Sequence, residues 1–241
     1  VGRFFLSAHV RHRATLQEWE VIVVYGPADH SLSLEFLGEL QAKVASVGTR
    51  NLPLLVGGDF NLIRSGADKN NGIINWTRVS MFNSAIAAMA LREVARVGAR
   101  YTWTNKQLTL VRSVLDRVFM SAEWEMLFPM CSLHAETRIG SDHVPLILSS
   151  GEDRLKRSPR FFFETAWFEN PEFEQIFLSK WESCVARIRH ARGPMDFWIS
   201  AGAGLRAALK GWGANQGRAD KLLRACLVTD LACMDAAADV Q

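Results

Sequence analysis

The stretch Leu54–Asn61 (LLVGGDFN) constrains the fold of this chain more than any other. Its apolar run predicts a short buried strand, which two glycines close in a tight turn. Asp59 and Asn61 leave that turn two residues apart, so in an extended exit both point the same way, while Phe60 turns back into the core. We expect this pair to hold a water and a phosphate oxygen. In the alternative, an ordinary Gly-Asp turn, Asp59 bonds only the local backbone.

Three other positions carry polar chemistry near predicted strands. Tyr25 ends a β-rich run, where its hydroxyl could donate to a phosphate. Asp116 lies inside the β run Val114–Met120, and an unpaired buried carboxylate costs several kcal/mol, so we expect Arg112 or His143 as its partner. The Ser-Asp-His sequence that contains His143 also fits an ordinary capped turn before a strand.

Six motifs occur in an order that resembles the endonuclease/exonuclease/phosphatase superfamily, in particular the endonuclease domain of plant non-LTR (LINE-type) retrotransposons. The resemblance covers residues 3–149, and residues 160–212 look like the linker toward the reverse transcriptase of those elements. The motifs are VYGP (Val24–Pro27), GGDFN (Gly57–Asn61), NW (Asn75–Trp76) before a helix, YTWTN (Tyr101–Asn105), LDRVF (Leu115–Phe119) and SDHVPL (Ser141–Leu146).

The resemblance implies a role for each residue that these motifs carry. Asp59 would activate the water, Asn61 and Tyr25 would bond the phosphate, and Asp116 would orient His143 against the scissile phosphate. The remaining implied residues are Asp142 for a divalent metal, Mg²⁺ or Mn²⁺, and Asn105 and Arg78 for the substrate, which would be DNA.

Two departures from the family pattern shape the functional expectation. The family's first half carries an Asn and a metal-binding Glu that no motif here matches, and Ala28 stands where relatives commonly have Asn. We therefore expect an α/β fold, a partial, N-terminally truncated four-layer sandwich followed by a helical tail. The expected function is a Mg²⁺-dependent DNA endonuclease, present as an inactive fragment. A phosphatase of the same superfamily, acting on a small phosphorylated molecule, and a non-catalytic nucleic-acid-binding remnant are the alternatives.

Periodicity predicts the elements that surround these motifs. A hairpin joins Phe4–Val10 to Trp19–Tyr25, and a plain surface loop is expected at Arg64–Asn75, with the border of a substrate groove as the alternative. At residue 150 the pattern changes, so we predict one domain over 1–150, a polar linker at Gly151–Pro159 and a helical region over 151–241. The expected helices are Ser33–Val47, Arg78–Met89, Ser121–Phe128, Pro171–Arg192, Met195–Gly213 and Arg218–Val240, with a break at Gly211–Gly217 and with Ile176, Trp181 and Ile188 on one face.

The amino-acid composition excludes few classes of protein. The 241 residues are 49% hydrophobic, enough for a core, and carry a net charge of +3, too little to establish nucleic-acid binding. Cys131, Cys184, Cys226 and Cys233 show no metal-ligand spacing, so we expect free, buried thiols in a reducing compartment. Because no apolar run reaches membrane length and no signal peptide opens the chain, we expect a soluble intracellular protein with no membrane partner. The sequence leaves the oligomeric state open.

Overall fold

The computed structural model describes residues 1–105, 107, 109–151, 161–163, 165–216 and 218–238. The chain forms two compact units: Val1–Asp153 with Val228–Gln241, and Arg154–Leu227. Residues Val228–Gln241, assigned to the helical tail from the sequence, thus group with the first unit. Most of the predicted linker, residues 152–160, lies outside the described residues, and the boundary at residue 150 stays a prediction.

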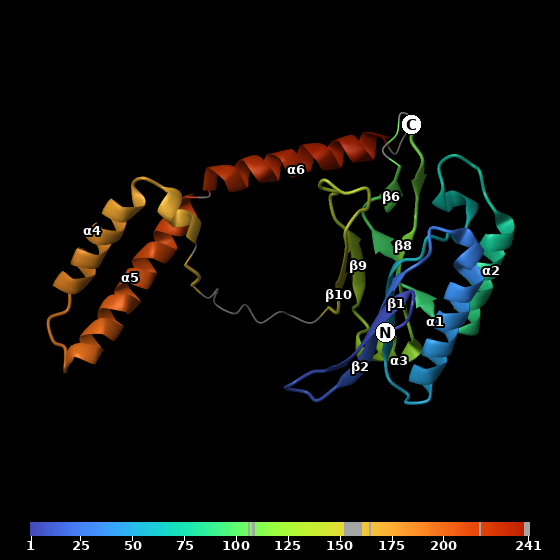
Figure 1. Cartoon of the computed structure of the whole chain (residues 1–241), viewed down its shortest axis with the longest axis horizontal. Coiled ribbons are helices and arrows are strands. Elements are labelled where there is room, and N and C mark those ends of the chain that lie inside the picture. The colour runs from blue at the N-terminus through green and yellow to red at the C-terminus, as the bar shows by residue number, and fades with distance from the viewer. Residues whose placement is uncertain (106, 108, 152–160, 164, 217, 239–241) are drawn as a thin grey trace. The chain divides into compact units, whose positions relative to one another are not determined.

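A five-stranded mixed sheet forms the centre of the first unit (Figure 1). The predicted hairpin is present, and its second strand pairs in parallel with the GGDFN strand through a helical crossover. Parallel neighbours need such a crossover, so strand, helix and strand form one α/β unit. The strands, in spatial order, are β1 (Phe5–Arg11), β2 (Glu18–Tyr25), β3 (Leu54–Asp59), β8 (Asp116–Met120) and β4 (Arg92–Glu93).

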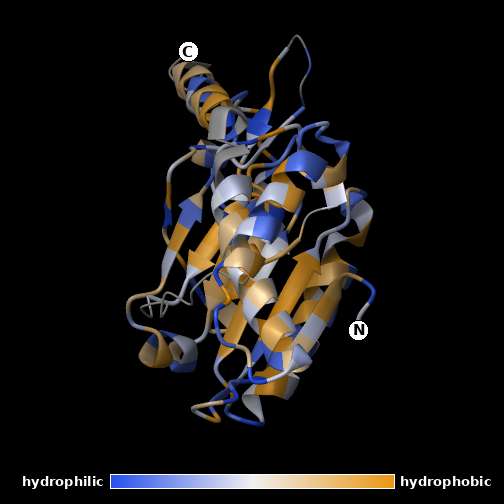
Figure 2. Cartoon of the chain, turned by 90° about the vertical axis from the view of Figure 1, so that its left-hand side faces the viewer, coloured by the Kyte–Doolittle hydropathy of each residue, from blue (hydrophilic) through white to orange (hydrophobic). Residues whose placement is uncertain are grey.

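Helices α1 (Ser33–Gly48) and α2 (Trp76–Ala88) cover one face of this sheet. Phe60 is fully buried there, as expected, and its ring packs edge-on against Phe119 with 5.2 Å between centroids. Figure 2 shows several of the strands in the orange of hydrophobic residues. The core of this face also contains Ile22, Val24, Phe36, Leu37, Leu40, Val47, Val56, Phe82 and Ile86.

A three-stranded sheet packs on the opposite face of the central sheet around a second core. Val118 and Met120 of β8 meet Leu133 and helix α3 (Ala122–Leu127) in this core. The described residues therefore build a helix layer, a five-stranded sheet and a three-stranded sheet. The smaller strands are β10 (Leu146–Ser149), β9 (Ser132–Ala135) and β5 (Arg96–Val97), and a separate pair is β6 (Trp103–Thr104) with β7 (Arg112–Ser113).

Strands β4 and β5 were not predicted from the sequence. Each is two residues long and contains an arginine, so neither shows the alternation of polar and apolar residues that marks a strand. Pairing with β8 and β9 forms these strands, and a single-sequence pattern does not contain that information.

The second unit is helical, as expected, with α4 (Phe173–Ala186), α5 (Pro194–Gln216) and a short 3-10 helix, Thr165–Glu169. Its core joins Trp167 and Phe173 to Leu209, with Leu205 and Trp212 beside them. Helix α6 (Arg218–Ala238) follows.

Three expectations for the helical part and the cysteines were wrong. The predicted break at Gly211–Gly217 is absent up to Gln216, where α5 ends. Gly213 packs so closely on the Trp167 ring that an added Cβ would lie 2.5 Å from it, and this packing outweighs the weak helix propensity of glycine. Ile188 lies beyond the end of α4. The cysteines are free, but Cys226 and Cys233 are exposed. None of the helices in the described part of the chain combines the length and hydrophobicity that a bilayer-spanning segment needs.

Candidate active site

Two glycines bring the end of β2 against the exit of β3. Gly58 has φ +139°, and a Cβ there would lie 2.1 Å from the Val24 carbonyl oxygen. A Cβ on Gly26 would lie 2.2 Å from the carbonyl oxygen of Phe60. Only glycine permits both approaches, and the Gly26 N–H then donates to the Asp59 carbonyl at 2.7 Å. The VYGP and GGDFN motifs therefore form one interlocked turn.

Asp59 and Asn61 meet at this turn, although the backbone is not extended as we expected. Asn61 has φ +49°, a left-handed conformation that Asn tolerates better than most residues. Its N–H donates to Asp59 Oδ1 at 2.9 Å, and its Nδ2 donates to Asp59 Oδ2 at 3.2 Å and to the Gly26 carbonyl at 2.8 Å. Asp59 thus bonds the local backbone, as in the ordinary turn, and also faces the site described next.

His143 connects two carboxylates that lie on neighbouring strands. Asp59 and Asp116 are paired across β3 and β8, and Tyr25 is paired with Asp59 across β2 and β3. The Nδ1 of His143 lies 2.9 Å from Asp116 Oδ2, and an ionised carboxylate only accepts, so Nδ1 carries the hydrogen. The Nε2 then faces Asp59 Oδ2 at 4.0 Å. Of the two partners expected for Asp116, His143 is therefore the one present.

Asp142 joins the same group from the turn before β10. The Trp103 indole N–H donates to Asp142 Oδ2 at 3.2 Å, and the Thr104 N–H donates to its carbonyl at 3.0 Å. The Ser141 hydroxyl accepts from the His143 N–H at 3.0 Å, which holds the turn. Asp59, Asp116, Asp142 and His143 are called the acidic cluster below.

A cavity of about 840 Å³ opens over the acidic cluster. Asp59 is only 9% exposed, and burial raises the pKa of its carboxyl, with the nearby charges of Asp116 and Asp142 raising it further. The Asn61 N–H and His143 act in the opposite direction. A carboxylate with a raised pKa is a stronger base, which suits proton abstraction from water.

The cavity gathers seven of the eight residues that the sequence nominated, while Asp116 lies outside it behind His143. Tyr25 is 71% exposed at its edge. The carboxamide of Asn105 is engaged with its own loop, since it donates to Thr109 O and accepts from the N–H of Val111, so its substrate role stays a prediction. The seven are Tyr25, Asp59, Asn61, Arg78, Asn105, Asp142 and His143.

The described residues do not form a complete metal site. Among them, no group of three or more His, Cys, Asp or Glu side chains is arranged to hold a metal ion. Asp142 and Asp59 offer the hard oxygen atoms that Mg²⁺ prefers, but Mg²⁺ demands near-octahedral geometry. The donor set seen here does not fit that requirement by itself.

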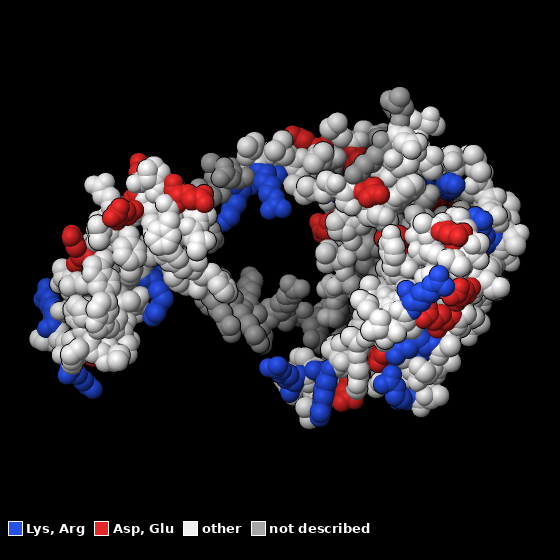
Figure 3. Space-filling view, in the orientation of Figure 1, with Lys and Arg blue, Asp and Glu red and all other residues white. Residues whose placement is uncertain are grey.

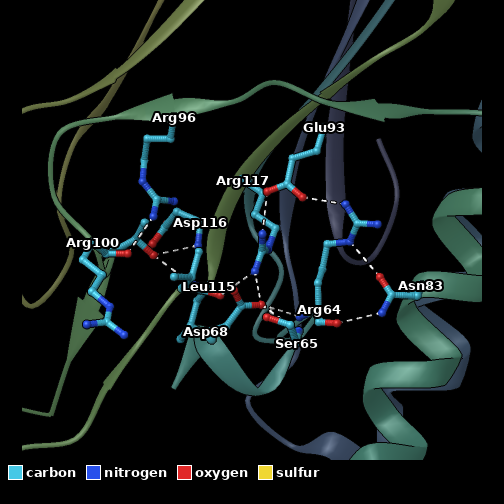
Figure 4. A network of polar contacts seen from close by, with 12 residues as sticks. Arg64, Ser65, Asp68, Asn83, Glu93, Arg96, Arg100, Leu115, Asp116 and Arg117 are labelled. Carbon is cyan, nitrogen blue, oxygen red and sulfur yellow. Dashed lines mark hydrogen bonds and ion pairs between the residues drawn. The ribbon is translucent and has the colours of Figure 1, made fainter. Parts of the chain in front are cut away.

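A buried ionic network beside the site was not recognised from the sequence (Figure 4). Arg117, 5% exposed, donates to Glu93 Oε1 and to Asp68 Oδ2. Arg64 donates to Glu93 Oε2 at 2.6 Å and to Asn83 at 2.7 Å. Arg117 belongs to the LDRVF motif, but within that motif a role was predicted only for its neighbour Asp116.

This network corrects the expectation that Arg64–Asn75 is a plain surface loop. Asp68 Oδ2 also accepts from the Arg64 and Ser65 N–H groups, and the Asp68 carbonyl accepts from Val114 at 2.8 Å. The loop is therefore anchored to strand β8, and Lys69 from it lines the cavity. The residues of the loop, mostly polar or small, gave no sign of this anchoring.

Structural comparison shows a fold similar to that of a solved endonuclease domain. The endonuclease domain of TRAS1, a telomere-specific non-LTR retrotransposon, matches with a TM-score of 0.51 and 16% identity over 63% of this chain. The chain spans 65% of that domain. At this identity the likeness concerns the fold.

Two structures from Neisseria are also similar, with TM-scores below 0.5. The 3′-5′ exonuclease NExo from Neisseria meningitidis has a TM-score of 0.45 and 18% identity, over 54% of this chain and 60% of that one. The 3′ phosphatase NExo bound to a product DNA hairpin has a TM-score of 0.49 and 19% identity, over 61% of this chain and 64% of that one. No protein-family model and no curated protein matches the chain.

Proposed function

We propose that the cavity is a phosphodiester-hydrolysing site of the retrotransposon endonuclease type, acting on DNA. The observation that carries this proposal is the geometry of His143, which Asp116 holds at 2.9 Å while its Nε2 faces the buried Asp59 across 4.0 Å. That gap is too long for a direct hydrogen bond and leaves room for a reacting atom between base and imidazole. The likeness of the fold to the TRAS1 endonuclease domain supports the same reaction class.

The chemistry follows from the positions of these side chains. Asp59 takes a proton from a water whose oxygen forms the new bond to phosphorus, while the bond from phosphorus to the leaving oxygen breaks and that oxygen takes a proton from solvent water. Asn61 holds the Asp59 carboxylate in place through its N–H and Nδ2. A protonated His143 donates from Nε2 to a phosphoryl oxygen and so offsets the charge that develops there. The phenol of Tyr25, at the edge of the cavity, donates to the phosphate.

A divalent metal would offset charge on the phosphoryl group, but no complete ligand set exists among the described residues. We therefore propose that hydrolysis by this chain alone is very weak, and that further oxygen ligands come from a polypeptide segment equivalent to the part of the endonuclease domain that the chain does not match. Asp142 would contribute one oxygen ligand to that combined site.

Nicking of supercoiled plasmid with Mg²⁺ or Mn²⁺ tests both statements. We expect the purified chain to nick no faster than background, with Asp142→Asn unchanged. Fusion to the unmatched part of a related endonuclease domain should produce nicking, which Asp59→Asn or His143→Ala should lower by about 10²–10⁴-fold. Fast nicking by the unfused chain, abolished in Asp59→Asn, would contradict the need for added ligands. An inactive fusion that is folded and binds DNA would contradict the proposed reaction.

A second candidate is nucleic-acid binding without hydrolysis. The incomplete metal ligand set among the described residues favours it. DNA binding that weakens with rising salt, in a folded fusion that never nicks, would support this candidate over the first.

A further inference from the structure

Three basic side chains line the same cavity but lie apart from the acidic cluster. His30 comes from the 3-10 helix His30–Leu32, Lys69 from the anchored loop, and Arg78 from the first turn of α2. They are called the basic cluster below. Burial and then the charges of Arg78 and Lys69 lower the pKa of His30, whereas the charges acting on Asp59 are those of the acidic cluster. The two clusters therefore occupy different parts of one cavity.

The positive charges of Lys69 and Arg78 are not paired with a carboxylate among the described residues. Arg78 makes no side-chain hydrogen bond or ion pair with any residue that the structure describes, and Lys69 Nζ donates only to the Ile73 carbonyl at 3.3 Å. The carboxylates nearest in sequence are committed elsewhere: Asp68 to Arg117, and Asp29 to the Ser31 N–H. Asp29 remains the one acid whose charge acts on His30.

An anion that reaches the acidic cluster is repelled by its carboxylates. Attraction must then come from another contact, and the basic cluster is the cationic surface of the same cavity. At about 840 Å³ the cavity lies in the upper part of the usual range of ligand pockets, roughly 300–1,000 Å³, and greatly exceeds one phosphate ion. A ligand with several phosphates can occupy both clusters at once, whereas a small phosphomonoester cannot.

We propose that His30, Lys69 and Arg78 form a subsite for a phosphate that flanks the scissile one, so that the cavity selects polynucleotides over small phosphate esters. This rests on the proposed function for the identity of the scissile position. The occupant is a nucleic-acid strand with at least two phosphates, one over each cluster.

Binding measured without hydrolysis tests the subsite. The 241-residue chain is titrated against a fluorescein-labelled single-stranded oligothymidylate of about eight nucleotides. Fluorescence anisotropy follows binding at several salt concentrations and without divalent cations. The double variant Lys69→Gln/Arg78→Gln should bind at least about tenfold more weakly. Its slope of log K against log salt should fall by about 0.7, since the subsite holds one phosphate and each phosphate contact on a single strand contributes about 0.7.

The control removes the same charge elsewhere. Figure 3 shows basic side chains at the tip of the β1–β2 hairpin, where Arg11 and Arg13 lie, and Arg11→Gln/Arg13→Gln should leave the affinity within about twofold. If both double variants lose the same affinity, binding comes from nonspecific electrostatic attraction and the subsite is refuted. The pair Lys69→Arg/Arg78→Lys keeps the charge and should retain binding, and circular dichroism checks that each variant is folded.

Competition identifies the ligand class. Unlabelled oligothymidylate should displace the probe, while thymidine monophosphate and inorganic phosphate should do so only at concentrations at least about 100-fold higher. Equal potency of the monophosphate would overturn the selection of polynucleotides. Because no step requires hydrolysis, an inactive chain can still support the subsite. An active fusion with unchanged binding in Lys69→Gln/Arg78→Gln would refute only the subsite.

Discussion

The acidic and basic clusters share one cavity but are built in different ways. Two acidic residues lie on regular structure: Asp59 ends β3, Asp116 begins β8, and the register places them side by side, while Asp142 and His143 come from the turn before β10. The basic residues lie on a 3-10 helix, a loop and a helix start, and the ionic network around Arg117 holds the loop against β8. Strand ends therefore position Asp59 and Asp116, whereas a buried ion network positions the loop that carries Lys69.

Removal of the Arg117 charge should have the largest effect on stability, because it takes away the side chain that anchors the loop carrying Lys69. Arg117→Met leaves Asp68 and Glu93, whose side chains are 15% and 27% exposed, without their shared cation. Loss of one partner of a buried ion pair costs about 3–5 kcal/mol, so we expect that reduction in the free energy of unfolding. Urea denaturation measures it, and amide hydrogen exchange should show faster opening in residues 64–75.

A matched control separates burial from charge. Arg92→Met removes a cation from an exposed pair with Glu125, whose side chains are 58% and 47% exposed, and such pairs contribute about 0.2–1 kcal/mol. If Arg117→Met cost no more than Arg92→Met, the network would not be what holds the loop.

The sequence predicted the acidic cluster well and the basic cluster hardly at all. Asp59, Asp116 and His143 follow strands and turns whose apolar runs and glycines are visible locally, so their convergence could be expected from strand order. Lys69 and His30 carry no local signal, because an exposed cation in a loop looks like any other. Only tertiary contacts, above all Arg117 with Asp68, show that the loop is fixed.

The same limit applies to the fold. The hairpin, α1 and the GGDFN strand follow from periodicity and were confirmed. Strands β4 and β5 arise from pairing with neighbours distant in sequence, and α5 continues through Gly213 because of the Trp167 ring. Where packing between distant residues decides the conformation, local preference predicts the wrong outcome.

A methyl group on Gly58 should disturb the acidic cluster from its backbone side. The φ of +139° costs an L-residue about 1–3 kcal/mol, and the Cβ would meet the Val24 carbonyl oxygen at 2.1 Å. We expect Gly58→Ala to lower the free energy of unfolding by at least that amount in urea denaturation. Gly38→Ala in α1 is the control: a Cβ there meets nothing within 4 Å, so helix propensity should raise stability by about 1 kcal/mol. If Gly58→Ala leaves the free energy of unfolding unchanged, the turn does not require glycine at this position.

The smallest effect concerns the charge of Asp59 itself. Because its pKa is raised in the folded state, the folded chain holds the proton more tightly than the unfolded chain does. Ionisation of Asp59 therefore opposes folding: the stability present below the ordinary carboxyl pKa is lost as pH rises through the raised value. Asp59→Asn removes the charge with almost no change of shape; its Oδ1 can still accept from the Asn61 N–H, while its Nδ2 no longer accepts from Asn61 Nδ2. The variant should unfold at a higher temperature than the parent at pH 7.

Calorimetric scans between pH 7 and pH 3 test the sign of this effect, since the advantage of Asp59→Asn should shrink on acidification as Asp59 becomes protonated in both states. Asp29→Asn is a control of opposite sign, because hydrogen bonds from Ser31 lower the pKa of Asp29. That variant should lose stability at pH 7, and the loss should fade as the pH drops below the ordinary carboxyl value. If Asp59→Asn instead destabilises the chain at pH 7, then His143 and the Asn61 N–H outweigh burial. The acidic cluster would in that case be as well neutralised as the Arg117 network, and the contrast between the two would not hold.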